Sequence, residues 1–258
     1  MFVDTHAHIH TNPFKEDLGD VVKRAQEAGV EAIIDLGVDI ETSQLAIENA
    51  SNYDMVFAAA GVHPHEASHW NPSIRDALFD LLKQQKVVAV GEIGLDYHYH
   101  FAKPEEQEQA FCDQLAMARE MGLPVVIHSR KAIEDTLVQI DSVSTDSWQG
   151  VFHCYGDTEI EIPAILERGF HVSFTGVVTF KNFKRHEAVL AVPLDRLLLE
   201  TDAPFMSPTP LRGKRNEPAF LVHTAQWLAE LYGISLEKLA NQTTQNARNL
   251  FGLERAFH

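Results

Sequence analysis

The feature that most constrains the fold is a regular alternation of short apolar runs with helical stretches along the chain. The apolar runs occupy residues 1–4, 32–37, 55–61, 87–94, 123–128, 150–155, 169–174 and 196–202. Several are apolar almost without interruption, which is typical of strands buried on both faces of a parallel sheet. Strand and helix therefore alternate about eight times, which matches the size and rhythm of a (β/α)8 TIM-like barrel in the α/β class.

The stretches between these runs carry helix signals. The clearest predicted helices cover residues 14–29, 104–122 and 157–169, with two more within 217–252. Pro104 lies in a first turn and Gly122 at a helix end, which is the usual order of start and stop signals. Asp157 is the expected N-cap of the third helix, although Pro163 weakens that helix from within. Ser235 is the expected cap between the last two helices.

A doubly wound open sheet is the alternative fold. It is disfavoured because no G-x-G-x-x-G motif follows the first predicted strand. No linker, low-complexity run or change of composition divides the chain, so we expect a single domain over residues 1–258.

Charge and cysteine usage restrict the function. The chain has 21 Lys and Arg against 37 Asp and Glu, a formal charge of −16. Polyanions are repelled by such a chain at long range, which argues against a nonspecific nucleic-acid coat protein. A nuclease is not excluded, because bound divalent cations reverse the sign of charge inside a site.

Cys112 and Cys154 show no pairing pattern, and no signal peptide or apolar membrane span is recognisable, so we expect a cytoplasmic protein.

Metal-ligating residue types gather where the predicted strands end. Active sites of (β/α)8 barrels lie at the carboxyl ends of their strands. The residues found there are His6, His8, His63, His65, Glu92, His128, His153, Glu200 and Asp202. In the stretch "VDTHAHIH", His6 and His8 are two residues apart, so both point to one face of a strand. Taken alone, a polar strand edge facing water would also explain that pair.

The converging residues suit more than one cation. Imidazoles and carboxylates that are buried together need partners, and divalent cations would supply them. The candidate ligands are His6, His8, Glu92, His128, His153 and Asp202. This set exceeds the three protein ligands typical of one catalytic zinc, so we expect two cations. The first would take His6, His8 and Asp202, the second His128 and His153, and Glu92 would bridge them. Their identity stays open between Zn²⁺, Mn²⁺ and Mg²⁺, although imidazole ligands favour transition metals in affinity.

Some nearby residues are expected only in supporting or surface roles. Glu200 lies two residues before Asp202 on the same strand face and is a candidate for support or an occasional third ligand. Cys154 is given no ligand role. The histidines read as surface or loop residues are His10, His69, His98, His100, His171, His186, His223 and His258.

The stretches that carry these residues resemble the TatD family of metal-dependent hydrolases, within the amidohydrolase-like barrels. They read "DTHAHIH", "GVHPH", "VGEIGLDY", "PVVIHSR", "GVFHCY" and "LLLETDAPFMSPTPLRGKRNEP", in family order across nearly the whole chain. The first motif alone is weak, whereas "GEIGLDY" together with "ETDAPF…RGKRNEP" is highly specific. The resemblance implies a TIM-like barrel, two divalent cations per subunit and phosphodiester hydrolysis, often as a deoxyribonuclease.

The resemblance also assigns residues. It carries the metal role onto His6, His8, Glu92, His128, His153 and Asp202, all of which are present. Many amidohydrolase relatives have a modified lysine at the fourth strand. Glu92 at that position fits the TatD branch.

Further residues are candidates for holding substrate. His63 is expected to orient a phosphate or act as an acid near the leaving group, or else to be a loop histidine fixed by Pro64. Arg130 is expected to hold a phosphate with its planar guanidinium, or to form a salt bridge at the barrel rim.

Two basic segments are candidates for guiding a nucleic-acid strand. The first, interleaved with two phenylalanines, contains Lys181, Lys184 and Arg185. Basic and aromatic side chains together suit a single strand, and the alternative is a solvated helix start with two core phenylalanines. The second, residues 212–215, contributes Lys214, whereas Arg212 or Arg215 would pin the loop.

The favoured hypothesis is a two-metal hydrolase of phosphodiester bonds, above all at DNA ends. The cations would lower the pKa of a bridging water and neutralise phosphate oxygens, while Asp202 orients that water or takes its proton. Glu92 and His63 complete the candidate catalytic residues. The alternatives are a C–N or ester hydrolase of a small metabolite and a barrel that only binds metal. We expect DNA ends or a small phosphodiester as partner, no membrane and no obligate protein partner.

Overall fold

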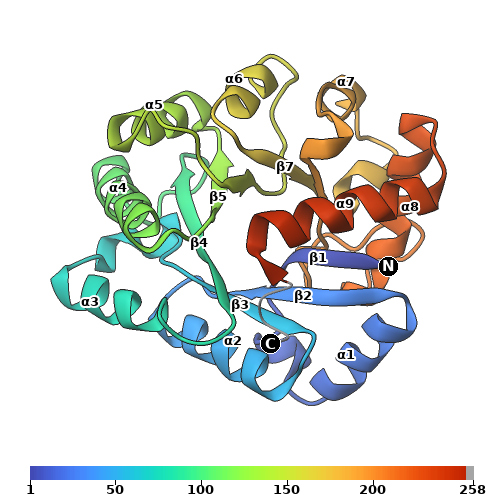
Figure 1. The fold of residues 1–258 in the computed structure, drawn as a ribbon, viewed down its shortest axis with the longest axis horizontal. Coiled ribbons are helices and arrows are strands. Elements are labelled where there is room, and N and C mark those ends of the chain that lie inside the picture. Colours follow the sequence, from blue (N-terminus) through green and yellow to red (C-terminus); the bar gives the residue numbers. More distant parts are fainter. Residues whose placement is uncertain (254–258) are drawn as a thin grey trace.

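A nearly closed barrel of parallel strands is the architecture of residues 1–253, which the computed structural model describes (Figure 1). The 8-stranded sheet runs in the order β1 to β8, each strand lying parallel to the next. The strands are β1 (Phe2–Ala7), β2 (Val30–Leu36), β3 (Val56–Ala60), β4 (Val87–Asp96), β5 (Val125–Arg130), β6 (Gly150–Phe152), β7 (His171–Phe174) and β8 (Leu197–Leu199). Each overlaps one predicted apolar run, so the predicted (β/α)8 TIM-like barrel is confirmed.

The first and last strands meet at their carboxyl ends. Ala7 and Ala203 form a parallel bridge. The His8 N–H donates to the Ala203 carbonyl at 2.7 Å, and the Asp202 N–H donates to the His6 carbonyl at 2.9 Å. These bonds place the segments that carry His8 and Asp202 side by side.

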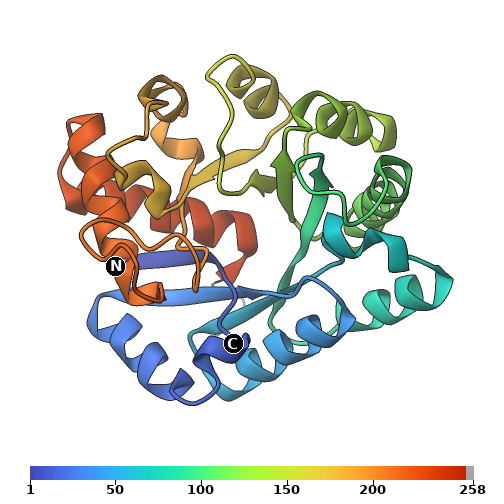
Figure 2. The same cartoon turned by 180° about the vertical axis from the view of Figure 1, so that it is seen from behind.

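Helices surround the barrel on its outer side (Figures 1 and 2). They are α1 (Leu18–Glu27), α2 (Ile40–Asn52), α3 (Pro72–Leu81), α4 (Pro104–Met121), α5 (Ile133–Val143), α6 (Ile162–Glu167), α7 (His186–Ala191), α8 (Leu221–Tyr232) and α9 (Leu236–Phe251). Short 3-10 helices lie at η1 (Asn12–Phe14), η2 (Pro64–His69), η3 (Gly176–Thr179), η4 (Leu194–Arg196) and η5 (Pro218–Phe220). No helix among the described residues is long and apolar enough to cross a membrane.

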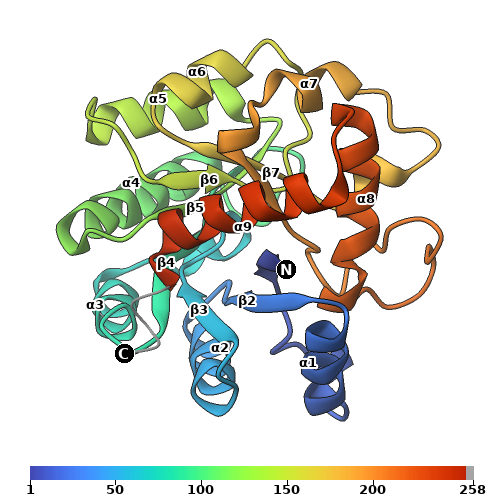
Figure 3. The same cartoon turned by 45° about the vertical axis from the view of Figure 1, so that its right-hand side comes forward.

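Helix α9 crosses one end of the barrel (Figure 3). Its residues Ala247, Leu250 and Phe251 join the apolar cluster inside the barrel. The Asn246 amide donates to the Leu197 carbonyl at 2.8 Å, at the start of β8. The helix therefore closes the amino end of the barrel and leaves the carboxyl end accessible.

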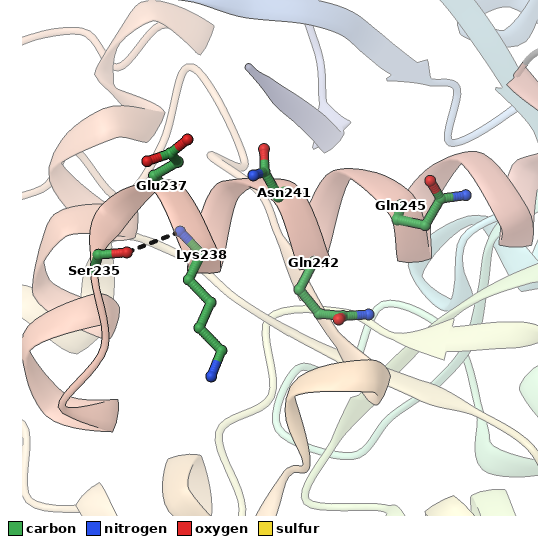
Figure 4. A pocket seen from close by; sticks show the side chains of 6 residues that line it. All are labelled: Ser235, Glu237, Lys238, Asn241, Gln242 and Gln245. Atoms are coloured by element: carbon green, nitrogen blue, oxygen red, sulfur yellow. Dashed lines mark hydrogen bonds between the residues drawn. The ribbon is translucent and has the colours of Figure 1, made fainter.

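The outward face of α9 bears a shallow hollow lined by polar side chains (Figure 4). They are Ser235, Glu237, Lys238, Asn241, Gln242 and Gln245. This hollow lies on the helix that closes the amino end, away from the carboxyl ends of the strands, so it plays no part in the predicted site.

Several boundaries differ from those predicted. The helix expected over 157–169 is the short α6, and Asp157 does not cap it. The reason is Pro163, which fits without loss only in the first turn, so the helix begins beside it. The helix expected over 14–29 begins at Leu18, after η1. The cap at Ser235 is confirmed, since its side chain accepts a hydrogen bond from the Lys238 N–H.

Candidate metal centre

The carboxyl end of the barrel brings all the predicted metal ligands together. They are His6 in β1, His8 just beyond it, Glu92 in β4, His128 in β5, His153 after β6 and Asp202 after β8. All are buried except His128, which is half-buried. Parallel strands end at one rim, so residues that are distant in sequence meet there.

The carboxylate of Glu92 lies at the middle of this cluster. Its Oε2 is 3.4 Å from His6 Nε2 and 3.7 Å from His8 Nε2. Its Oε1 is 2.8 Å from both His128 Nδ1 and His153 Nε2. The two oxygens of one side chain therefore face two different histidine groups, as a bridging carboxylate would.

Asp202 completes the first of these groups. Its Oδ1 lies 3.5 Å from His8 Nε2 and 3.8 Å from His6 Nε2. Its backbone has φ 55, a left-handed conformation that costs a non-glycine residue about 1–3 kcal/mol and is typical of functional sites. Burial raises the pKa of Asp202 to about 6, so its carboxyl gains from any nearby positive charge.

The pKa shifts in the cluster show that its buried carboxylates favour a positive charge beside them. Burial opposes ionisation of Glu92, but His153 and His63 outweigh it and hold its pKa well below the ordinary value. Burial also opposes a charge on His153, yet Glu92 and Glu200 raise its pKa well above the ordinary value. The buried carboxylates thus draw a proton onto the nearest imidazole.

The donor set fits divalent cations as the source of that charge. Among residues 1–253, no lysine or arginine forms an ion pair with Glu92, Glu200 or Asp202. The buried His6 Nδ1 has no hydrogen-bond partner. Ligating atoms lie within 4.8 Å of one another in the sets His6–His8–Asp202, His6–His153–Glu200 and His63–Glu92–His128. Imidazole nitrogen with carboxylate oxygen is the ligand combination of zinc and related metals.

Asp96 and His65 support this centre. His65 was expected at a strand end without a specific role, and Asp96 was not predicted. The Asp96 Oδ2 is 3.0 Å from both His65 Nε2 and His128 Nε2. Its Oδ1 accepts the N–H groups of His98 and Tyr99 at 2.8 and 3.0 Å. Burial opposes its charge, but the hydrogen bond from His128 and its other partners lower the pKa of Asp96 below the ordinary value. Such an outer carboxylate fixes the ring of a metal ligand, here leaving His128 Nδ1 directed at Glu92.

Asp96 lies beyond the predicted end of the fourth strand. The predicted fourth strand stops at residue 94, whereas β4 continues to Asp96 and keeps it on the face of Glu92. Gly94 is required here because a Cβ at this residue would lie 1.9 Å from the His128 carbonyl oxygen. Alternation by two from Glu92 was the signal that could have found Asp96.

Glu200 fixes the turn after β6. Its Oε1 accepts the Cys154 N–H at 2.7 Å, and its Oε2 accepts the Ser173 hydroxyl at 2.6 Å. The same Oε1 lies 3.4 Å from His153 Nδ1. Burial raises the pKa of the Cys154 thiol well above the ordinary value, so it stays a poor ligand.

His63 reaches the centre from the start of η2. Its Nε2 lies 3.4 Å from Glu92 Oε1, and its Nδ1 accepts the His65 N–H at 3.1 Å. That acceptor role leaves the ring proton on Nε2, which points into the cluster. Burial lowers the pKa of His63 to about 4, so the neutral ring is a hydrogen-bond donor there.

The predicted substrate-binding residues lie at the rim and not in the cluster. The Arg130 guanidinium is 4.9 Å from the centre of the Tyr99 ring and forms no salt bridge within residues 1–253. Among the described residues, no hydrogen bond or ion pair joins the remaining predicted cations to the cluster. These exposed residues are Lys181, Lys184, Arg185 and Lys214.

Two neighbours of these cations have structural roles. Arg215 pins its loop, donating to Asp17 Oδ1 at 2.8 Å and Oδ2 at 2.7 Å and also to the Pro13 carbonyl. The half-buried Phe183 packs against the main core, with its ring 5.9 Å from that of Trp227.

The prediction that His10 is a surface residue was wrong. The His10 side chain is only 2% exposed, and its Nδ1 lies 2.7 Å from Asp35 Oδ1. Asn49 donates to the other Asp35 oxygen at 2.8 Å. The partner lies in β2, so local spacing could not reveal it. His171 is half-buried at the start of β7, and His258 lies outside the described residues.

Comparisons with known proteins agree with this geometry. Residues 3–252 match the family described as TatD related DNase. The chain is 39% identical over 252 residues to the uncharacterized metal-dependent hydrolase YabD of Bacillus subtilis, covering 97% of this chain and 99% of that protein. It is 37% identical over 257 residues to the 3'-5' ssDNA/RNA exonuclease TatD of Klebsiella pneumoniae, covering 97% and 98%. The crystal structure of YJJV, a TatD homolog from Escherichia coli, matches with a TM-score of 0.90 at 29% identity, covering 97% and 98%.

Proposed function

The chain belongs to the TatD-related DNase family of metal-dependent hydrolases, and from that premise we propose that it hydrolyses phosphodiester bonds at the ends of single-stranded DNA. We also propose that two divalent cations serve this reaction and that residues 1–258 act as one domain. The cytoplasmic location expected from Cys112 and Cys154 remains a prediction.

The position of Glu92 is the observation that carries the proposal. One of its carboxylate oxygens faces His6 and His8, and the other faces His128 and His153. A single carboxylate between two imidazole groups suits a pair of cations better than one. We therefore assign Asp202, His6 and His8 to the first cation and the other two histidines to the second.

When bound, the two cations lower the pKa of the attacking water and neutralise the phosphate oxygens. Asp202 borders the first histidine group, so it is placed to orient that water and accept its proton. His63 carries its proton on the nitrogen that points into the cluster, so it donates a hydrogen bond to a phosphate or leaving oxygen. Asp96 and Glu200 hold the rings of His128 and His153 in place.

Rim cations would hold the rest of the substrate. Arg130 stands beside His128 with its guanidinium free of carboxylate partners within residues 1–253, so it is available to a phosphate. The further substrate-binding residues proposed are Lys181, Lys184, Arg185 and Lys214. With cations at the centre and along this rim, a chain of formal charge −16 can take up a polyanion at one restricted place.

The test is metal analysis and digestion of labelled single-stranded DNA with the same preparation. We expect two equivalents of divalent metal per chain and stepwise shortening of the strand, both abolished by a chelator and restored by metal. Labels at the 5' and 3' ends in separate reactions would give the polarity. Metal-bound protein that leaves the strand intact but hydrolyses a cyclic amide or a small ester would overturn the proposal.

A further inference from the structure

The exposed aromatic side chains of residues 1–253 are found at the carboxyl end of the barrel. They are Tyr99, Phe101 and Phe205, with exposed fractions of 41%, 65% and 57%. Every other Phe, Tyr or Trp among the described residues is buried or half-buried. Large aromatic rings are seldom left in water, and their restriction to one rim indicates a binding surface.

Phe205 borders the first histidine group. It lies in the loop after β8, three residues beyond Asp202. Its ring centre is 6.4 Å from that of His8, with the two planes inclined by 66°. An apolar face therefore stands directly beside the first proposed cation site.

Tyr99 and Phe101 border the second group, in the loop after β4. Their ring centres lie 5.4 and 4.8 Å from that of His65, and 5.7 Å from each other. His65 shares the Asp96 oxygen with His128, so ring contacts lead from the surface to the second proposed cation site. The Arg130 guanidinium over the Tyr99 ring adds a cation to this aromatic surface.

The order of the sheet puts these two aromatic surfaces on opposite sides of the centre. Phe205 belongs to the junction of β8 and β1, whereas Tyr99 and Phe101 follow β4. In a barrel of eight strands ordered β1 to β8, the loop after β8 and the loop after β4 lie on opposite sides of the rim (Figure 2). The Glu92 carboxylate lies between them, because one oxygen faces His8 and the other faces His128.

We propose that Phe205 on one side, and Tyr99 with Phe101 on the other, stack on the bases that flank the scissile phosphate. The inference rests on the proposed function and names what that site selects: an unpaired strand whose bases can turn onto protein rings. Aromatic stacking accepts any base because every base has a flat face, so the surface selects single strands with little sequence preference. Stacking also gives affinity that the acidic surface of this chain lacks.

The test uses a short single strand with a non-cleavable phosphonate at its terminal linkage and 2-aminopurine on either side of it. With the metal-loaded protein, we expect binding to quench the fluorescence of both bases. Phe205→Leu keeps an apolar side chain of similar size but removes the flat ring, so it should relieve quenching on one side only. Tyr99→Leu with Phe101→Leu should relieve it on the other side. Phe205→Trp should restore the quenching.

Affinity is the second readout. Each stacked base should contribute roughly tenfold to the Kd, so each set of variants should weaken the normal strand by about that factor. A strand with an abasic residue at the matching position should bind the wild-type protein and the variant alike. Val138→Ala is the control, since Val138 is 60% exposed on the outer helix α5. Metal content is measured for every variant.

The outcomes separate this inference from the proposed function. If the wild-type protein neither binds nor cuts the strand, the proposed function fails and the inference fails with it. If the wild-type protein cuts the strand and the variants quench and bind as it does, stacking alone is overturned. Variants that change a dimer into a monomer without altering strand binding would show that these rings join two copies of the chain, which also overturns stacking.

Discussion

At the scale of single residues, Glu92 has the central position in the cluster because its two oxygens face separate histidine groups. A shorter aspartate at this position would reach fewer of the histidines, and a neutral amide would supply one oxygen and no charge. The cluster has no lysine or arginine paired with it among residues 1–253, so its carboxylates depend on imidazoles or cations. A change at Glu92 should therefore affect both halves of the centre.

We predict that Glu92→Gln lowers metal occupancy at both sites, whereas His6→Ala and His8→Ala lower it at the first site only. Glutamine has the shape of glutamate, so the fold should persist while the bridging charge is lost. Affinity should fall by more than the roughly 10–100-fold that results from losing an outer partner of a ligand. Metal content per chain after gel filtration, together with circular dichroism, measures the effect.

The matched control is Glu105→Gln, the same chemical change on the exposed first turn of α4. It should leave the metal content unaltered. A Glu92→Gln protein that loses one equivalent and keeps the other tightly bound would show that Glu92 is a terminal ligand. Full occupancy in a His6→Ala and His8→Ala double variant would show that the first site is wrongly assigned.

At the scale of elements, two arginine–carboxylate pairs attach α1 to the loop after β8. Arg24 donates through Nε and Nη2 to the two oxygens of Glu217, at 2.9 and 2.7 Å. Arg215 forms a similar pair with Asp17. The same loop carries Phe205, so these pairs help to hold one side of the proposed substrate surface.

We predict that the Asp17 pair stabilises the fold in a pH-dependent manner. The hydrogen bond from Arg215, ahead of that from Arg24, lowers the pKa of Asp17 to about 2. A carboxyl with a depressed pKa stabilises the folded state above its unfolded pKa near 4, and this stabilisation disappears as the pH falls toward 2. Asp17→Asn should therefore cost about 0.5–1 kcal/mol at pH 7, a small value because the pair is partly exposed, and progressively less below pH 4.

Urea unfolding of both proteins at several pH values measures this difference. Asp80→Asn is the control, because Asp80 pairs with Lys83 on the surface with a side chain that is 77% exposed. Asp80→Asn should change the free energy of unfolding less, and its effect should not depend on pH in the same way. A cost for Asp17→Asn that stays constant from neutral pH to pH 3 would contradict the role given to the charge.

The elements also show what local sequence can predict. All eight strands could be predicted because each contains an apolar run that is buried in the barrel wall. The meeting of the candidate metal ligands could be predicted because parallel strands gather their ends at one rim. The last two residues of β4 were missed because the apolar run stops at residue 94 and Asp96 is polar, although its spacing of two from Glu92 was a usable signal. The role of His10 could not be predicted, because its partner Asp35 becomes a neighbour only when β1 and β2 pair.

At the scale of the whole molecule, a strongly acidic chain carries basic groups along one part of its rim. The loops after β7 and β8 are joined by a hydrogen bond from the Thr209 N–H to the Thr179 hydroxyl, at 2.8 Å. The Arg212 guanidinium lies 3.6 Å from the centre of the Phe180 ring across the same contact. The exposed cations of both loops therefore form one basic rim, defined as Lys181, Lys184, Arg185 and Lys214.

We predict that removing charge from the basic rim weakens the use of a DNA strand more than the use of a small phosphodiester. A small ester reaches only the centre, whereas a strand also passes over the rim. The triple change Lys181→Ala, Lys184→Ala and Arg185→Ala would be compared with Lys214→Ala, because the two lie on different loops. Each lost phosphate contact should reduce the slope of log affinity against log salt by roughly 0.7. Binding and turnover measured at several salt concentrations give this slope.

The salt series distinguishes a lost contact from a damaged fold. A phosphate contact weakens as salt rises, so the triple variant should differ most from the wild-type protein at low salt and approach it at high salt. Distortion of the barrel mouth would instead lower turnover on both substrates equally at every salt concentration. If neither substrate is affected at any salt concentration, the strand does not pass over the basic rim. The strand would then leave the centre on the side of Tyr99 and Phe101, where the Arg130 guanidinium lies over the Tyr99 ring.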